Sequence, residues 1–222
     1  MGSNGLTGKF IIIEGLDGSG TTTQLKLLQE WFKAEEEKSG KARPLYFTWE
    51  PTPGPVGSLI RLALHHRLQP FDEKTMALLY AADRTDHIYK EEKGGQEPGV
   101  LSKLRSGTHV ICDRYVLSSL AYQARELGLD WTFRVNDLAV SPDVTIYIDV
   151  DPVNAARRMA AARSHQDMYE SLPEQQKIRA QYFRAIEFLR EKGQRVEIVN
   201  GEGSPAQVRD AVLGVILPLL EG

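Results

Sequence analysis

The chain is poor in cysteine, in surplus positive charge and in long apolar runs. Its 222 residues include one cysteine, Cys112, so no disulfide bond can form within the chain. A formal net charge of −3 gives no general attraction to nucleic acids or to anionic membranes. No apolar run is long enough to span a membrane, and the first residues lack the apolar segment of a secretion signal. These absences favour a globular protein of the reducing cytoplasm, with no nucleic acid and no membrane as its partner.

The stretch around which the chain is organised, residues 9–32, also lacks a lysine at one position of a known motif. An apolar run leads there into a glycine-rich turn and then into a helical pattern, which is the context of a phosphate-binding loop, or P-loop. Residues 15–22 match the pattern G-x-x-x-x-G-K-[ST], except that Thr21 takes the place of the lysine. That lysine normally brings a cation to the outer phosphates of a nucleotide, and a hydroxyl cannot supply the charge. A tight strand-to-helix turn capped by threonine is the alternative that this stretch alone leaves open.

Short apolar runs alternate with helical patterns along most of the chain. Strands are expected at residues 10–13, 45–49, 109–112, 144–150 and 195–199. Helices are expected directly after the glycine turn and at residues 56–66, 72–93, 98–107, 116–125, 130–140, 152–162, 172–192 and 204–220. This alternation predicts an α/β fold, in which helices flank a five-stranded parallel sheet with a P-loop at its first turn. The length fits one domain at residues 1–222, with a mobile leader at about residues 1–8.

Two pairs of polar residues stand out beyond the glycine turn. Asp113 and Arg114 directly follow an expected strand, and ligands of open α/β sheets collect at the carboxyl ends of strands. Tyr80 and Arg84 lie four residues apart, so they share a helical face where they could hold a base and a phosphate. A tyrosine at the edge of the core beside a solvated arginine is the alternative for this second pair.

Four motifs, in this order, together resemble the thymidylate kinases, which belong to the P-loop nucleoside monophosphate kinases. They are EGLDGSGTTTQ, TWEPTPGPVG, the pair LYAADR and DRYVLSSLAYQ, and RRMAAARSHQDMYE, and the resemblance extends from Phe10 to about Val199. It implies transfer of the γ-phosphate of ATP to thymidine monophosphate in dTTP synthesis, with Mg²⁺ as the metal. It also implies a homodimer and a lid segment at about residues 158–170.

The resemblance also assigns roles to individual residues. It assigns binding of the ATP phosphates to Gly15, Gly18, Ser19, Gly20, Thr21, Thr22 and Thr23. It assigns binding of the adenine to Arg157 and Gly201. It assigns binding of thymidine monophosphate to Asp17, Glu50, Tyr80, Arg84, Arg114, Ser119, Tyr122 and Gln123. Thr22 and Asp113 are the implied magnesium ligands. Asp17, Arg114 and Arg163 are the implied catalytic residues, with Arg163 in the lid.

Within the thymidine monophosphate set, the implied roles differ. Tyr80 takes the place of an aromatic residue that stacks on thymine, and Arg84 takes that of an arginine that grips the monophosphate. Ser119 and Gln123 lie where polar groups read the edge of the base. Tyr122 matches a tyrosine beside the sugar, where it would crowd a 2′-hydroxyl.

Three departures from the family pattern remove positive charge from the phosphate region. Thr21 replaces the lysine, Trp49 replaces an arginine before Glu-Pro, and Met168 replaces an arginine of the lid. The P-loop also has no arginine, so the phosphate-contacting arginine is expected in or near the lid, at Arg158 or Arg163. Two alternatives therefore stay open: a kinase for another nucleotide or a nucleoside, and a nucleotide-binding protein that lost catalysis with the lysine.

Overall fold

Five parallel strands form the central sheet of the computed structural model, which describes residues 6–65, 67–69, 71–91, 97–162 and 171–221. The strands are β1 (Phe10–Gly15), β2 (Leu45–Trp49), β3 (His109–Asp113), β4 (Val144–Asp149) and β5 (Val196–Asn200). Their order across the sheet is β2-β3-β1-β4-β5, and every neighbouring pair is parallel. The predicted five-stranded parallel sheet is therefore confirmed.

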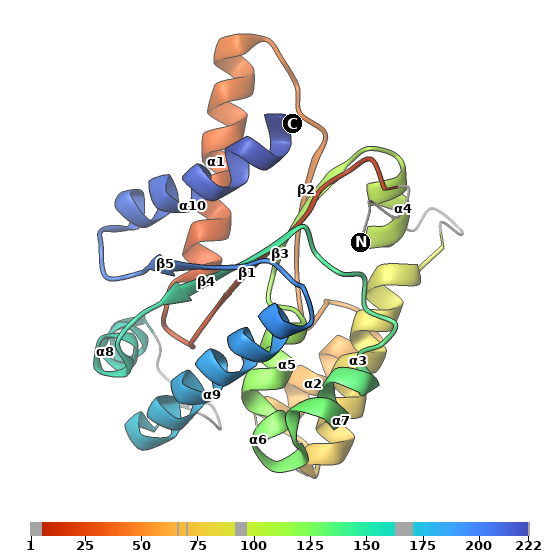
Figure 1. Cartoon of the computed structure of the whole chain (residues 1–222), viewed down its shortest axis with the longest axis vertical. Helices are drawn as coiled ribbons and strands as arrows, with labels where there is room; N and C mark the ends of the chain where they lie inside the picture. The colour runs from red at the N-terminus through yellow and green to blue at the C-terminus, as the bar shows by residue number, and fades with distance from the viewer. Residues whose placement is uncertain (1–5, 66, 70, 92–96, 163–170, 222) are drawn as a thin grey trace.

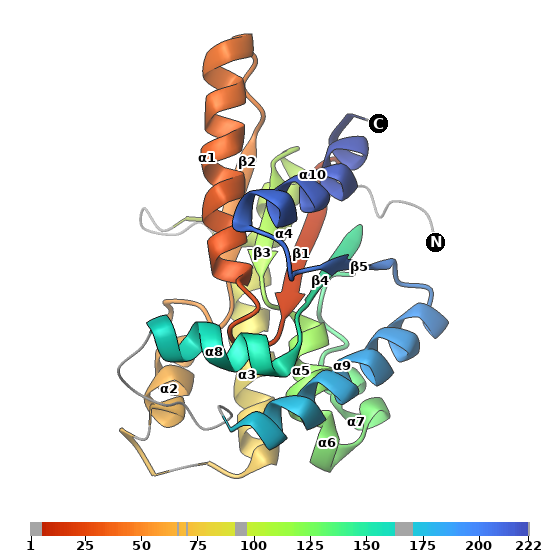
Figure 2. The same cartoon turned by 90° about the vertical axis from the view of Figure 1, so that its left-hand side faces the viewer.

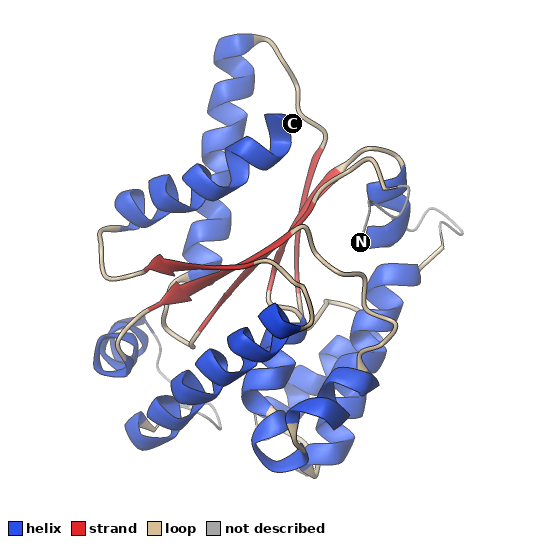
Figure 3. Ribbon diagram, in the orientation of Figure 1, coloured by secondary structure: helices blue, strands red, loops and turns tan. Residues whose placement is uncertain are grey.

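Helices cover both faces of this sheet (Figures 1 and 3). They are α1 (Thr21–Ser39), α2 (Pro55–Leu64), α3 (Glu73–Tyr89), α4 (Val100–Arg105), α5 (Val116–Tyr122), α6 (Ala124–Leu127), α7 (Leu129–Val135), α8 (Pro152–Ala162), α9 (Leu172–Glu191) and α10 (Pro205–Glu221). Helices α1 and α10 lie on one face, and α5 and α9 lie on the other (Figure 1). The two-sided cover explains why all six residues of β1 are buried.

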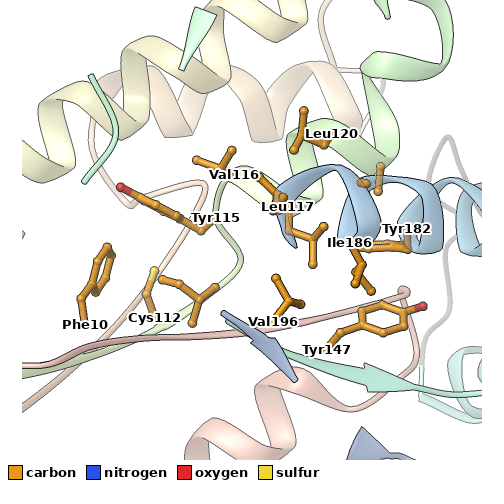
Figure 4. Close-up of a cluster of buried hydrophobic side chains, with 14 of the residues drawn as sticks. Phe10, Cys112, Tyr115, Val116, Leu117, Leu120, Tyr147, Tyr182, Ile186 and Val196 are labelled. Atoms are coloured by element: carbon orange, nitrogen blue, oxygen red, sulfur yellow. The ribbon is translucent and has the colours of Figure 1, made fainter. Parts of the chain in front are cut away.

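Alternate residues of the strands supply two separate cores. Ile11 and Ile13 of β1 pack with Leu28 of α1 and Val212 of α10. Phe10 and Ile12 point the other way, into a cluster with residues of α5 and α9. Figure 4 shows this second cluster, in which Tyr182 of α9 lies close to Tyr147 of β4. The period-two alternation of a strand thus anchors a helix layer on each face.

Some helices end earlier than expected. The predicted helix at residues 130–140 ends at Val135, because Asn136 turns its side-chain amide back to the carbonyl oxygen of Thr132 at 2.8 Å. The predicted helix at residues 116–125 is divided at Gln123 into α5 and α6. The predicted helix at residues 72–93 ends at Tyr89, since Lys90 leaves the helical conformation with ψ of 124°.

Only part of the leader and of the lid lies within the described residues. Residues 6–8 of the leader are described, and the Gly8 N–H donates to the carbonyl oxygen of Leu104 at 2.8 Å. Helix α8 covers the start of the lid, whereas residues 163–170 lie outside the described part. No helix in the described part combines the length and the apolar character that crossing a membrane requires.

Candidate active site

The P-loop joins β1 to α1 at the carboxyl end of β1. Gly18 and Gly20 have φ angles of 83° and 96°, which are in the left-handed region that favours glycine. A Cβ atom on Gly18 would lie 2.4 Å from the Ala155 carbonyl oxygen of α8, so a side chain is excluded there. Figure 2 shows α8 crossing beyond the end of β1. Because α1 begins at Thr21, its unpaired N–H groups face the loop and favour an anion.

Thr22 and Asp113, the predicted magnesium ligands, meet beside this loop. The Thr22 hydroxyl donates to Oδ2 of Asp113 at 2.9 Å. Oδ1 of Asp113 is buried and has no hydrogen-bond partner among the described residues. Burial raises the pKa of the Asp113 carboxyl above its ordinary value, although Arg114 and the Thr22 hydroxyl oppose the shift. A divalent cation here would give Oδ1 a partner and stabilise the ionised carboxylate.

This donor set fits Mg²⁺ in particular. The described residues contain no group of three or more His, Cys, Asp or Glu side chains that could hold a metal by themselves. Mg²⁺ usually keeps several waters and is bound by one or two protein oxygens together with substrate phosphates. The Thr22 hydroxyl and the Asp113 carboxylate match that requirement, with the P-loop placed to supply the phosphates.

A single pocket of about 150 Å³ brings together all the residues assigned to thymidine monophosphate. Its lining includes Asp17, Glu50, Tyr80, Arg84, Arg114, Ser119, Tyr122 and Gln123. These residues come from the P-loop, the end of β2, helix α3 and the segment from β3 to α5. Asp17 belongs to both the P-loop and the pocket, so the two sites adjoin.

Arg114 is held where the P-loop and this pocket meet. Its backbone has a φ of 72°, which is rare for a residue with a side chain. Its guanidinium donates to Asp17 at 2.5 Å, to the Tyr182 hydroxyl at 3.0 Å and to Ser118 at 3.3 Å. The side chain keeps 19% of its surface exposed, so it can still face a ligand. The catalytic role that the resemblance implies for Arg114 stays a prediction.

Arg84 lies at the floor of the pocket and is only 3% exposed. Its guanidinium donates to Oε2 of Glu50 at 2.9 Å and to Ser119 at 3.3 Å, and it also contacts Oδ1 of Asn136. Glu50 is held in turn by His87, whose Nδ1 lies 3.0 Å from Oε1. The alternative of a solvated arginine beside Tyr80 is therefore wrong. The grip of Arg84 on a phosphate stays a prediction, and its burial favours contact with the part of a ligand that enters deepest.

On the donor side, Arg158 rather than Arg157 approaches the turn at Gly201. Arg158 donates from Nη2 to the Gly201 carbonyl oxygen at 3.0 Å and from Nη1 to that of Ser19 at 3.5 Å. Arg157 is exposed and donates to Asn154 of its own helix at 2.8 Å. Asn154 in turn donates to Glu202, next to Gly201, at 2.9 Å, and the adenine role of Arg157 and Gly201 stays a prediction. Arg163 lies outside the described residues.

The structure describes two of the three positions at which the chain lacks a positive charge of the family pattern. The Thr21 side chain is buried at the start of α1. Trp49 is 49% exposed at the end of β2, and Met168 lies outside the described residues. Within the described part of the chain, Arg114 contacts the P-loop through Asp17, and Arg158 contacts it through Ser19.

Several buried polar residues that support the site were not predicted. Asn136 holds Arg84, and Tyr182 and the partly buried Ser118 hold Arg114. Glu14 is fully buried and accepts hydrogen bonds from the backbone N–H groups of Tyr115 and Ser118. Burial raises the pKa of Glu14 to about 7 against the opposing charge of Arg114. A carboxylate at the end of an apolar strand was the one available signal, and it marked Glu14 alone.

Comparison with known proteins agrees with this geometry. The family model for thymidylate kinase matches residues 13–212. A probable thymidylate kinase of Pyrococcus abyssi is 37% identical over 217 residues, which cover 95% of this chain and 97% of that protein. The corresponding protein of Pyrococcus horikoshii is 36% identical with the same coverage. A third, from Methanococcus maripaludis, is 35% identical over 214 residues, covering 94% of this chain and 95% of the relative. The chain therefore belongs to the thymidylate kinase family.

Proposed function

We propose that the chain transfers the γ-phosphate of ATP to thymidine monophosphate, giving ADP and thymidine diphosphate for dTTP synthesis. The observation that carries this proposal is the shared position of Asp17. A P-loop suited to a nucleoside triphosphate and a pocket lined by the thymidine monophosphate residues adjoin at that side chain. Membership of the thymidylate kinase family supports the same acceptor and gives no support to another nucleotide or to a non-catalytic role.

In this reaction an oxygen of the acceptor phosphate attacks the γ-phosphorus while the bond to the ADP oxygen breaks. The protein has only to position the two nucleotides and neutralise charge, so no covalent intermediate is needed. Mg²⁺, when bound, supplies charge neutralisation at the phosphates. Thr22 and Asp113 would hold the metal, the start of α1 binds the triphosphate, and Arg114 stabilises the phosphoryl group as it moves.

The pocket supports selection of a deoxyribose and of thymine. Tyr122 is almost fully buried, and hydrogen bonds with Asp17 and Arg114 tie down its hydroxyl. Its ring therefore cannot move aside easily for a 2′-hydroxyl. Ser119 and Gln123 are buried polar side chains on the wall, which suits hydrogen bonding to the edge of a base.

We expect the wild-type chain to prefer deoxyuridine monophosphate over uridine monophosphate, because the two differ only at the 2′-hydroxyl. The preference in kcat/KM should be at least about tenfold, as for other steric exclusions in pockets. Tyr122→Ala should reduce this ratio, whereas Tyr122→Phe should retain it because the ring remains. A coupled assay of ADP release gives all three ratios, with thymidine monophosphate as the best acceptor. Equal use of the uridine and deoxyuridine nucleotides by the wild type would rule out this role for Tyr122.

The resemblance also supports a homodimer and a cytoplasmic location. Large apolar side chains are exposed on α2 and α3 and after α7: Leu62 by 42%, Leu78 by 53% and Leu138 by 60%. A second copy would cover such side chains, which suits packing through helices beside the sheet. The buried free thiol of Cys112 suits a reducing compartment.

A further inference from the structure

The hydroxyl of Tyr182 lies under the site, and phosphoryl transfer as described above does not use it. Tyr182 belongs to α9, and its side chain is 0% exposed. Its oxygen lies 3.0 Å from the Gly15 carbonyl oxygen at the start of the P-loop. The same oxygen accepts from Nη1 of Arg114 at 3.0 Å. One hydroxyl thus joins the backbone of the donor loop to the arginine of the acceptor side.

We propose that Tyr182 is a positioning residue for phosphoryl transfer, whose hydroxyl fixes the Arg114 guanidinium against the backbone of the P-loop. This inference rests on the proposed function, because it gives Arg114 its task. Tyr182 is fully buried and does not line the pocket, so it would act on the nucleotides only through Arg114.

The partners of Arg114 differ in how firmly they are held. Asp17 is part of the P-loop and keeps 30% of its side-chain surface exposed, so a ligand can draw it away. Tyr182, in contrast, is fixed by packing. Its ring packs against Tyr147 at 4.8 Å between centroids, with the ring planes tilted by 31°, and meets Tyr122 edge-on at 6.1 Å. The tyrosine is therefore the rigid anchor of a long and otherwise mobile side chain.

The contacts of the Tyr182 hydroxyl indicate its orientation. Its oxygen lies 3.0 Å from the Gly15 carbonyl oxygen, which can only accept, so the Tyr182 hydroxyl donates there. The Ser118 hydroxyl donates to Oε2 of Glu14 at 2.5 Å, so neither hydroxyl hydrogen is left for the 3.0 Å contact between Ser118 and Tyr182. Both hydroxyl oxygens then remain as acceptors for the Arg114 guanidinium.

The test replaces Tyr182 with phenylalanine, which removes one oxygen and keeps the ring. We expect kcat to fall about tenfold, with the KM values for ATP and thymidine monophosphate within about twofold of wild type. Tyr147→Phe is the matched control, because that hydroxyl is also buried and has no hydrogen-bond partner within the described part of the chain. Its kcat should equal that of the wild type. Equal kcat values for the two variants would overturn the proposal.

Two further measurements separate positioning from a general effect on structure. In an Arg114→Ala background, Tyr182→Phe should cause no further loss of kcat, whereas a purely structural role would give the same loss again. The Nε–H nuclear magnetic resonance signal of Arg114, assigned by its absence in Arg114→Ala, should shift in Tyr182→Phe and stay in place in Tyr147→Phe. If the wild type transfers no phosphate, the proposed function fails. An unchanged signal in Tyr182→Phe would overturn the hold on Arg114 whether or not the wild type is active.

Discussion

Replacing Arg114 with alanine should lower kcat/KM by about 10²-fold or more for both substrates. The guanidinium lies where the P-loop and the acceptor pocket meet, and it is fixed by Asp17, Ser118 and Tyr182. The transferred phosphoryl group must pass between those two sites, so a preorganised cation there stabilises charge in the transition state. Steady-state kinetics with ATP and thymidine monophosphate measure the effect.

Arg125→Ala is the matched control for this loss. Arg125 is on α6 and pairs with Glu174 of α9, and both side chains are about one-quarter exposed. It does not belong to the pocket lining. Exposed or partly exposed ion pairs contribute roughly 0–1 kcal/mol, so the control should be folded and nearly as active as the wild type. If both variants retain the same activity, Arg114 has no place in the chemistry.

Removing Arg84 should have the largest effect on stability. Arg84→Met leaves the Glu50 carboxylate buried without its guanidinium partner, which lies 2.9 Å away, with both side chains 3% exposed. Breaking one side of a buried ion pair typically lowers the free energy of unfolding by about 3–5 kcal/mol. The pocket also loses its floor, so affinity for thymidine monophosphate should fall. Urea unfolding and calorimetric titration measure the two effects.

A second ion pair, which is more exposed to solvent, provides the comparison for the loss of stability. Arg179→Met breaks a pair with Asp149, which has two contacts of 2.8 and 2.7 Å, but the arginine is 34% exposed. Solvent can replace that partner, so the loss should stay near or below about 1 kcal/mol. Adding Glu50→Gln to Arg84→Met should restore part of the lost stability, because the stranded charge is removed. Equal losses for the two arginines, or no recovery in the double variant, would contradict this explanation.

The sheet could be predicted from the sequence because its strands are short, mostly apolar runs. In the inner strand β1, burial on both faces favours successive apolar residues, as at residues 10–13, and that signal is local. The ends of helices were less predictable. The end of α7 depends on Asn136, whose amide bonds Thr132 while its oxygen meets Arg84 of α3. The second of these contacts joins distant helices, so residues 130–140 alone do not contain it.

The same distinction applies to the site. The P-loop was indicated by its residue types and spacing, and the pocket residues were indicated by the resemblance of their motifs to the family. Tyr182 and Asn136 act through partners that are far away in the sequence, and their own surroundings are ordinary helix. Which of Arg157 and Arg158 contacts the turn at Gly201 depends on the rotation of α8 about its axis relative to the P-loop. That rotation follows from the close approach of Ala155 to Gly18, a tertiary contact.

The missing P-loop lysine leaves catalysis itself as the decisive question. Arg114 and Arg158 contact the loop among the described residues, and the Thr21 hydroxyl can only donate a neutral hydrogen bond. Thr21→Lys should therefore increase the affinity for ATP, because it returns a cation to the outer phosphates.

The most direct measurement uses the wild-type chain, Mg²⁺, thymidine monophosphate and ATP labelled in its γ-phosphate. We expect the label to appear in thymidine diphosphate at a rate proportional to the protein concentration, and to be lost in Arg114→Ala. Binding of both nucleotides with all of the label remaining in ATP would contradict the proposed function and identify a binding protein that lost catalysis with its lysine.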